Sequence, residues 1–290
     1  LVFGESDGLP GLVVDRYGDV LVCQVTTAGM ERLKADIVAA LEKVLKPAVI
    51  VFRNDVGVRE LEGLPLYVET ALGTAPATVQ VEEHGQKFEA PLEGGQKTGW
   101  FFDQHDNRAR LLRYVKGQRV LDVCSYVGGW SVQAAAHGAT GVTAVDSSAT
   151  ALGWVQKNAQ ANGVKVDTLH ADAFDALKDL KDQGQKFGVV VLDPPAFVKR
   201  RKDLAAGKDA YRRLNQLAMQ VLERDGMLIS CSCSHHMSAE DLLGAIQTAV
   251  RHLGRDAQVL EQGMQAPDHP VHPAIPETSY LKAFYVRVVA

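Results

Sequence analysis

The sequence predicts an α/β protein in which an open parallel β-sheet is preceded by a smaller α+β domain. Two observations support this prediction. Beyond residue 118, short apolar runs alternate with helical patterns, which is typical of a parallel sheet with helical crossovers. Residues 1–99 instead show closely spaced apolar runs separated by turn residues. We therefore assign residues 1–99 to a first domain and residues 100–290, beginning with a linker helix, to a second.

The first domain is predicted from its turns and from one helical repeat. Glycine-containing turns flank residues 12–15 and 20–25, which we expect to pair as a β-hairpin. Apolar residues recur at helical spacing over residues 33–45 and stop before a proline, so a helix is expected there. Residues 48–53 follow as a strand and residues 79–91 as a second hairpin. No motif in this domain indicates chemistry.

Aromatic and basic residues cluster where the second domain begins. Three aromatic residues at 100–102 precede a helical pattern that carries four cations: Arg108, Arg110, Arg113 and Lys116. Aromatic rings beside cations can stack on a base and hold its phosphates. The same residues can equally form a clamp between domains with a solvated basic face, and the segment alone leaves both interpretations open.

The stretch Q-R-V-L-D-V-C-S-Y-V-G-G-W, residues 118–130, predicts a buried strand that runs into a tight glycine turn and then a helix. Open α/β sheets bind ligands at such strand ends. The dinucleotide pattern G-x-G-x-x-G is absent, which favours S-adenosylmethionine over NAD. Asp146, at the end of the next apolar run, can accept hydrogen bonds from ribose hydroxyls. A strand–turn–helix without a ligand is the alternative.

Three aspartates are expected at the carboxyl ends of successive strands. Asp146, Asp172 and Asp193 follow apolar runs, the last two at residues 166–170 and 187–192. Strand ends of a parallel sheet meet at one edge, so these carboxylates should approach one pocket. The predicted cofactor-binding residues are Ser125, Tyr126, Gly128, Asp146, Asp172 and Asp193.

The remaining elements continue the alternation of helices and strands. Helices are expected over residues 149–162 and 208–223, and a further helix should start at Ser238. Strands are expected over residues 227–233 and 280–289.

The loop Asp193-Pro194-Pro195-Ala196-Phe197 is the first segment that specifies chemistry. Two prolines stiffen the loop, so the carboxylate and the ring are presented in fixed directions. A carboxylate can hydrogen-bond a base and an aromatic ring can stack on it. A rigid crossover loop without a ligand is the structural alternative. The predicted substrate-binding residues are Pro194, Pro195, Phe197, Arg200, Arg201 and Lys202.

The last three of these residues begin a basic segment. Cations outnumber acids between residues 199 and 213, which favours contact with phosphates; a solvated charged face is the alternative. The members of this segment are Lys199, Arg200, Arg201, Lys202, Lys208, Arg212 and Arg213.

Two cysteines lie two residues apart in S-C-S-C-S-H-H, residues 230–236. On an extended strand Cys231 and Cys233 share a face, and Cys233 lies nearer the open end, so it is the better placed nucleophile. The spacing does not match a zinc site, and we predict no metal. Packed, inert thiols are expected for Cys23, Cys124 and Cys231.

Composition and charge limit the partners and the cellular location that we expect for this protein. The net charge of −4 and pI near 6.2 indicate no global affinity for nucleic acid, so any such contact must be local. No apolar run approaches the roughly 20 residues of a membrane span, and no signal peptide is visible. We expect a cytoplasmic protein with reduced thiols and no membrane partner.

These motifs together resemble the bacterial large-subunit methyltransferase I family, which forms 5-methylcytosine in 23S ribosomal RNA. The similarity extends over nearly the whole chain. The segments that carry the resemblance are G-E-S-D-G-L-P-G-L, H-G-Q-K, K-T-G-W-F-F-D-Q, D-P-P-A-F, S-C-S-H-H-M, D-H-P and Y-L-K. The resemblance implies a seven-stranded, Rossmann-like class I methyltransferase sheet, S-adenosylmethionine as the cofactor, and 23S ribosomal RNA or its large-subunit precursor as the partner.

The resemblance also implies site residues. The family's catalytic cysteine carries over to Cys233 and its motif-four acid to Asp193. Thiolate addition to carbon 6 of cytosine would make carbon 5 nucleophilic enough to attack the methyl sulfonium. The family's N-terminal PUA RNA-binding domain has no clear counterpart before Leu1, and a role in positioning RNA is an option for residues 1–99.

Several alternatives stay open. A related enzyme could methylate a guanine nitrogen through the same D-P-P-A-F loop without a cysteine, and a small-molecule methyltransferase is a weaker option. A non-catalytic RNA-binding or ribosome assembly factor could retain the fold. Water, His235 and His236 are the candidates for the base that removes the carbon 5 proton, and a homodimer is an option for the assembly.

Overall fold

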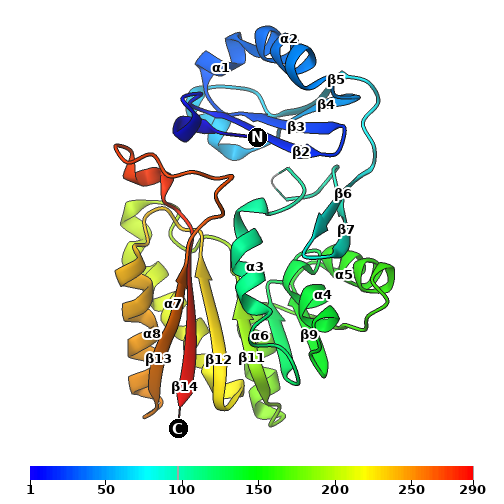
Figure 1. The fold of residues 1–290 in the computed structure, drawn as a ribbon. Helices are drawn as coiled ribbons and strands as arrows, with labels where there is room; N and C mark the ends of the chain where they lie inside the picture. Colours follow the sequence, from blue (N-terminus) through cyan, green and yellow to red (C-terminus); the bar gives the residue numbers. More distant parts are fainter. Residues whose placement is uncertain (97, 290) are drawn as a thin grey trace. The chain divides into compact units, whose positions relative to one another are not determined.

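The computed structural model describes residues 1–96 and 98–289; Lys97, which lies in the K-T-G-W-F-F-D-Q motif, and Ala290 lie outside the described residues. The chain folds into two compact units (Figure 1). The first comprises Leu1–Glu82, Glu89–Asp103 and Ala266–Thr278, and the second Glu83–Phe88, Gln104–Gln265 and Ser279–Ala290. The chain therefore passes between the units several times.

The first unit contains a five-stranded sheet in the order β1-β2-β3-β4-β5. Its elements are β1 (Val2–Phe3), β2 (Leu12–Tyr17), β3 (Val20–Val25), α1 (Ala28–Arg32), α2 (Lys34–Leu45), β4 (Val49–Asn54) and β5 (Tyr67–Leu72). The predicted hairpin is confirmed, since β2 and β3 pair antiparallel. The predicted helix and following strand correspond to α2 and β4. Strand β5 was not predicted: none of its six residues is buried and three are exposed, so the strand lacks a clear apolar pattern.

The predicted second hairpin is also confirmed. Strands β6 (Thr78–Glu83) and β7 (Gln86–Pro91) form a two-stranded sheet of their own. Its turn uses left-handed conformations at His84 (φ 50°) and Gly85 (φ 81°), a combination that suits a two-residue hairpin turn.

The second unit is built on a seven-stranded sheet in the order β10-β9-β8-β11-β12-β14-β13 (Figure 1). Its strands are β8 (Arg119–Val123), β9 (Gly141–Asp146), β10 (Asp167–His170), β11 (Phe187–Leu192), β12 (Leu222–Ser232), β13 (Asp256–Gly263) and β14 (Lys282–Val289). The central strand β11 is buried along its whole length, as expected for a parallel strand covered on both faces.

The predicted seven-stranded sheet is confirmed, and it is mixed rather than parallel throughout. Strands β10, β9, β8, β11 and β12 pair in parallel, whereas β14 is antiparallel to both β12 and β13. Parallel neighbours need a long crossover, usually a helix. No α-helix occurs between β13 and β14, so the chain re-enters the sheet in the opposite direction.

The helices of this unit are α3 (His105–Leu111), α4 (Gly129–Ala136), α5 (Ala149–Ala161), α6 (Ala173–Asp182), α7 (Leu204–Val221) and α8 (Ala239–His252). The predicted start of α8 is confirmed, because the Ser238 side chain accepts a hydrogen bond from the Asp241 amide. Helix α7 starts four residues earlier than predicted, and α6 was not predicted from the sequence. Among the described residues, no helix is long and apolar enough to cross a membrane.

Candidate active site

The turn from β8 to α4 brings the ends of two strands together. The backbone is left-handed at Cys124 (φ 67°), Tyr126 (φ 50°) and Gly128 (φ 90°). This path lets the Tyr126 amide donate a hydrogen bond of 2.9 Å to Asp146 Oδ2. A Cβ at Gly128 would lie 3.2 Å from Val132 and 3.3 Å from Val155, so glycine is required for both conformation and space.

Asp146 is positioned to receive further hydrogen bonds. Its Oδ1 accepts from the Ser148 amide at 2.9 Å while Oδ2 accepts from Tyr126, so each carboxylate oxygen holds one donor. A carboxylate oxygen has two lone pairs, and this side chain is half-buried at the end of β9. The arrangement fixes the carboxylate and leaves it able to accept from two ribose hydroxyls.

Asp172, which is predicted to bind the cofactor, is the N-cap residue of α6. Its Oδ1 accepts a hydrogen bond of 2.8 Å from the Phe174 amide and thereby caps the N-terminus of α6. The residue is exposed, unlike Asp146 and Asp193. It lies just beyond the end of β10, where the strand-end argument placed it.

Asp193 is held by two side chains that sequence reasoning missed. Gln104 Nε2 donates to its Oδ1 at 2.9 Å, and Trp130 Nε1 donates to its Oδ2 at 3.0 Å. Two N–H donors, one on each oxygen, fix the orientation of this carboxylate. Trp130 follows the glycine pair and Gln104 ends the K-T-G-W-F-F-D-Q motif, so both lie in segments that the sequence motifs had already marked.

A fourth acid lies beneath these strand ends. Asp122 in β8 is fully buried and accepts a hydrogen bond from Ser131 Oγ. Burial, followed by the charges of Asp193 and Asp146, raises the pKa of Asp122 to about 7. In the sequence, Asp122 is an acid inside an otherwise apolar strand, a pattern that predicts a buried carboxyl group. Asp146, Asp172 and Asp193 make this edge of the sheet acidic, which suits a ligand with a sulfonium and an ammonium group.

One buried hydroxyl fits a bound cofactor. Ser125 is 3% exposed, and within residues 1–96 and 98–289 its Oγ has no hydrogen-bond partner. A buried polar atom without a partner costs free energy unless a ligand or water satisfies it. Ser125 lies in the same turn as Tyr126 and Gly128. This turn is therefore suited to hold a polar ligand beside Asp146.

The two cysteines at the end of β12 differ in environment. Cys231 is fully buried, and burial followed by the charge of Asp193 raises its thiol pKa well above the ordinary value. Cys233 is half-buried, with its Sγ 4.0 Å from the carbonyl oxygen of Pro194. The structure thus brings Cys233 against the D-P-P-A-F loop, whereas Cys231 is a packed thiol.

A buried lysine stands beside Cys233. Lys282 Nζ donates to the carbonyl of Ser234 at 2.7 Å and to that of Tyr280 at 2.9 Å. Burial lowers the pKa of Lys282 to about 8, and the nearby Cys233 opposes that shift. In the sequence, the Y-L-K segment that contains Lys282 supported the family resemblance but gave no sign of a role for this lysine. His235 and His236 are exposed, and the ring of His235 stacks on Tyr280 with centroids 5.3 Å apart.

Phe197 is not brought to the residues that hold Asp193. Its ring packs against Tyr211 and Phe174, with centroid distances of 4.8 and 6.2 Å. Of the two prolines, Pro194 is buried and Pro195 is exposed. The loop therefore sends its carboxylate and its ring to different neighbours.

The basic segment after this loop is less uniform than its sequence suggested. Arg200 pairs with Asp203 at 3.1 Å, whereas Arg201 and Lys202 are exposed and form no ion pair within the described part of the chain. Lys208 pairs with Asp241 at 2.6 Å and Arg212 with Asp209 at 2.7 Å.

The basic residues of α3 and the segment after it are mostly paired with acids. Trp100 is 3% exposed and belongs to the first unit. Arg108 is buried and donates to Glu83, with Nη2 2.7 Å from Oε2. Arg110 and Arg113 both pair with Glu261. Acids thus engage three of the four predicted cations.

Comparison with known proteins agrees with this fold and with S-adenosylmethionine as the cofactor. Residues 64–287 match the family model described as S-adenosylmethionine-dependent methyltransferase. Two solved structures share the fold with a TM-score of 0.86 and 22% sequence identity. One is a SAM-dependent methyltransferase from Streptococcus mutans, aligned over 98% of this chain and 73% of that one. The other is a methyltransferase complexed with SAH, aligned over 99% and 74%. The fold and site define a methyltransferase that uses S-adenosylmethionine.

A curated relative makes the assignment narrower. The ribosomal RNA large subunit methyltransferase I of Klebsiella pneumoniae is 41% identical over 293 aligned residues, which cover 100% of this chain and 73% of the relative. The chain belongs to the ribosomal RNA large subunit methyltransferase I family.

Proposed function

We propose that this protein methylates carbon 5 of a cytosine in 23S ribosomal RNA, with Cys233 as the covalent nucleophile. The observation that carries this proposal is the position of Cys233 Sγ, 4.0 Å from the carbonyl of Pro194 in the D-P-P-A-F loop. A half-buried thiol beside a loop that begins with a fixed carboxylate suits covalent activation of a base.

The cofactor would be held by the turn after β8 and by the acids at the neighbouring strand ends. Ser125 Oγ and the amides around Gly128 would contact its polar groups, and Asp146 would accept from the ribose hydroxyls. Tyr126, Asp172 and Asp193 complete the proposed set of contacts. When bound, S-adenosylmethionine supplies an electrophilic methyl group on a sulfonium.

In the proposed reaction the Cys233 thiolate adds to carbon 6 of cytosine. A bond forms between Sγ and carbon 6, and the electron pair of the carbon 5–carbon 6 double bond becomes available at carbon 5. Carbon 5 then attacks the methyl group, whose bond to sulfur breaks. A base removes the carbon 5 proton, the double bond re-forms, and the thiolate leaves as the carbon 6–Sγ bond breaks.

Two residues would support these steps. Asp193, oriented by Gln104 and Trp130, would share a proton with ring nitrogen 3 and so stabilise the negative charge that develops on the base. Lys282 holds the carbonyl of Ser234 and places a cation near Cys233, which favours the thiolate over the thiol. Lys282 would thus act as a positioning residue.

RNA contact is assigned to the D-P-P-A-F loop and the basic segment after it. Arg201 and Lys202 are exposed and unpaired within the described residues, so they are available for phosphates. Arg200 would have to exchange Asp203 for phosphate. Pro194 and Pro195 would shape the loop that receives the base, and Phe197 would support it through Tyr211 and Phe174.

Mass mapping of methylated nucleosides tests the proposal. Large-subunit ribosomal RNA is incubated with the protein and S-adenosylmethionine, then digested and analysed. We expect one new 5-methylcytosine. A methylated guanine would instead support nitrogen chemistry through the same loop, and RNA binding without methyl transfer would support an assembly factor.

A further inference from the structure

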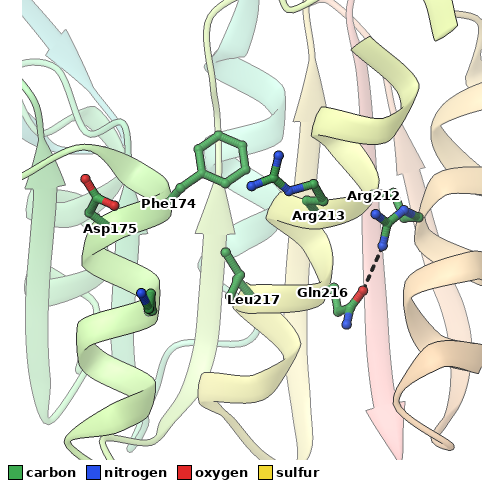
Figure 2. Close-up of a pocket in the computed structure, with 7 residues that line it drawn as sticks. Phe174, Asp175, Arg212, Arg213, Gln216 and Leu217 are labelled. Carbon is green, nitrogen blue, oxygen red and sulfur yellow. Dashed lines mark hydrogen bonds between the residues drawn. The ribbon is translucent and has the colours of Figure 1, made fainter. Parts of the chain in front are cut away.

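A second basic surface lies in the groove between α6 and α7. The groove encloses about 480 Å³ and is lined by Phe174, Asp175, Lys178, Arg212, Arg213, Gln216 and Leu217 (Figure 2). Three of these residues are cations and one is an acid. None of them belongs to the cofactor or thiol groups described above.

Two of the groove's cations lack acidic partners. Arg212 is neutralised by Asp209 at 2.7 Å and also donates to Gln216 at 2.9 Å, the bond drawn in Figure 2. Lys178 and Arg213 are exposed, and across residues 1–96 and 98–289 neither forms an ion pair. Their charges therefore remain available to an anion.

The groove also presents an aromatic support for one of these cations. The guanidinium carbon of Arg213 lies 5.5 Å from the centre of the Phe174 ring, and Figure 2 shows the two side chains facing each other across the groove. Stacking on a ring orients a guanidinium while its N–H donors stay directed outward. An oriented guanidinium can hold a phosphate with two hydrogen bonds.

One residue that lines the groove contacts the loop assigned to the substrate. Phe174 contacts Phe197 of the D-P-P-A-F loop at a centroid distance of 6.2 Å, and Phe197 contacts Tyr211 of α7 at 4.8 Å. The charge of Lys178 and Arg213 and this contact with the substrate loop together indicate RNA as the occupant.

We infer that the α6–α7 groove binds the phosphate backbone of the RNA that flanks the methylated nucleotide, with Lys178 and Arg213 as the phosphate contacts and Phe174 as the support of Arg213. This inference rests on the proposed function for the identity of the RNA. It adds Lys178 and Phe174 of α6 to the end of the basic segment that contains Arg213, and it does not involve Arg200, Arg201 or Lys202.

The test compares the double variant Lys178→Gln/Arg213→Gln with wild type on a large-subunit ribosomal RNA fragment. Both side chains are exposed and make no hydrogen bond within the described residues, so the variant should fold. RNA affinity is measured at several salt concentrations, and S-adenosylmethionine affinity by calorimetry. Removing one phosphate-binding cation should reduce the slope of log K against log salt by about 1, so we expect a reduction of about 2. The KM for RNA should rise about tenfold at 0.1 M salt, with cofactor affinity unchanged.

The matched control is Lys157→Gln/Arg251→Gln. Lys157 lies 4.0 Å from the centre of the Trp154 ring, so it is also a cation beside an aromatic residue, and Arg251 is an exposed arginine on α8. This control should keep the wild-type salt slope. An unchanged slope in the groove variant, or an equal decrease in the control, would overturn the inference. If wild type binds RNA with a slope that depends on the groove yet transfers no methyl group, the proposed function fails and the groove assignment stands.

Discussion

Lys282 Nζ donates a hydrogen bond of 2.7 Å to the carbonyl oxygen of Ser234, the residue that follows Cys233. The lysine enters from β14, the antiparallel strand that pairs with β12 and places Ser232 opposite Lys282. Strand β14, which lies between β12 and β13, therefore carries a buried cation to the turn that contains the candidate nucleophile.

Replacing Lys282 with methionine should slow reactions of the Cys233 thiolate. The variant lacks a positive charge near the sulfur, so the thiol pKa should rise and alkylation by iodoacetamide at pH 7 should slow about tenfold for a shift of about one unit. Peptide mapping assigns the modification to Cys233. Removing two hydrogen bonds to carbonyls should also cost about 1–3 kcal/mol of stability.

Lys186→Met is the control for this variant. Lys186 Nζ also donates to a backbone carbonyl, that of Gln220 at 2.7 Å, but it precedes β11 at the opposite end of the strands. It should leave Cys233 alkylation unchanged. Equal alkylation of wild type and Lys282→Met would show that the lysine only holds the turn.

Replacing Asp146 with asparagine should weaken cofactor binding. The amide keeps one oxygen but lacks the charge that strengthens hydrogen bonds to ribose hydroxyls, a difference of about 1–3 kcal/mol, or roughly 5- to 150-fold in affinity. Isothermal calorimetry with S-adenosylmethionine measures the effect. Asp167→Asn, at the exposed start of β10, is the control and should bind as wild type does. Unaltered affinity in the Asp146 variant would remove this residue from the cofactor site.

The strand ends show how much of the site the sequence could predict. The positions of Asp146, Asp172 and Asp193 follow from local patterns, because each acid comes directly after, or within two residues of, the end of a strand. The partners of Asp193 could not be predicted in this way. Gln104 lies 89 positions away and Trp130 lies 63 away, so only the folded sheet brings them to the carboxylate.

The fold shows the same division between local and long-range information. Hairpins and caps were predicted correctly because turn residues and the Ser238 cap act within a few positions. The direction of β14 depends on how residues 264–281 return to the sheet, which no local pattern encodes. Phe197 likewise follows Asp193 by four positions, yet its ring packs on α6 and α7.

Replacing Asp122 with asparagine should change how stability depends on pH. Folding raises the pKa of Asp122 from 3.8 to about 7, so the folded state favours the protonated carboxyl. That contribution to stability is full below pH 3.8 and is lost as the pH rises to about 7. Between pH 5 and 8 the asparagine variant should gain stability relative to wild type by on the order of 2 kcal/mol.

Urea unfolding at pH 5 and at pH 8 measures this difference for Asp122→Asn. Asp179→Asn, at an exposed position on α6, is the control and should follow wild type at both values. A stability difference that does not change with pH would mean that Asp122 stays ionised, with its charge compensated inside the sheet.

Replacing Cys233 and Cys231 one at a time tests which of the two thiols is the covalent nucleophile. Cys233→Ala should fold and bind S-adenosylmethionine but lose nearly all methyl transfer, because Cys231 is fully buried and its thiol pKa is raised well above the ordinary value. Cys231→Ala should lose about 1 kcal/mol of stability through a small cavity and keep its activity.

RNA that contains 5-fluorocytosine gives a direct measurement of this choice. Fluorine replaces the proton that must leave carbon 5, so the thiolate cannot be released after methyl transfer and the protein should remain attached to the RNA. Mass spectrometry of the attached peptide should place the link on Cys233, and Cys231→Ala should form the same adduct. A fully active Cys233→Ala variant, or a link on Cys231, would reject Cys233 as the nucleophile. Active wild type without any adduct would instead favour methylation of a nitrogen, which needs no covalent intermediate.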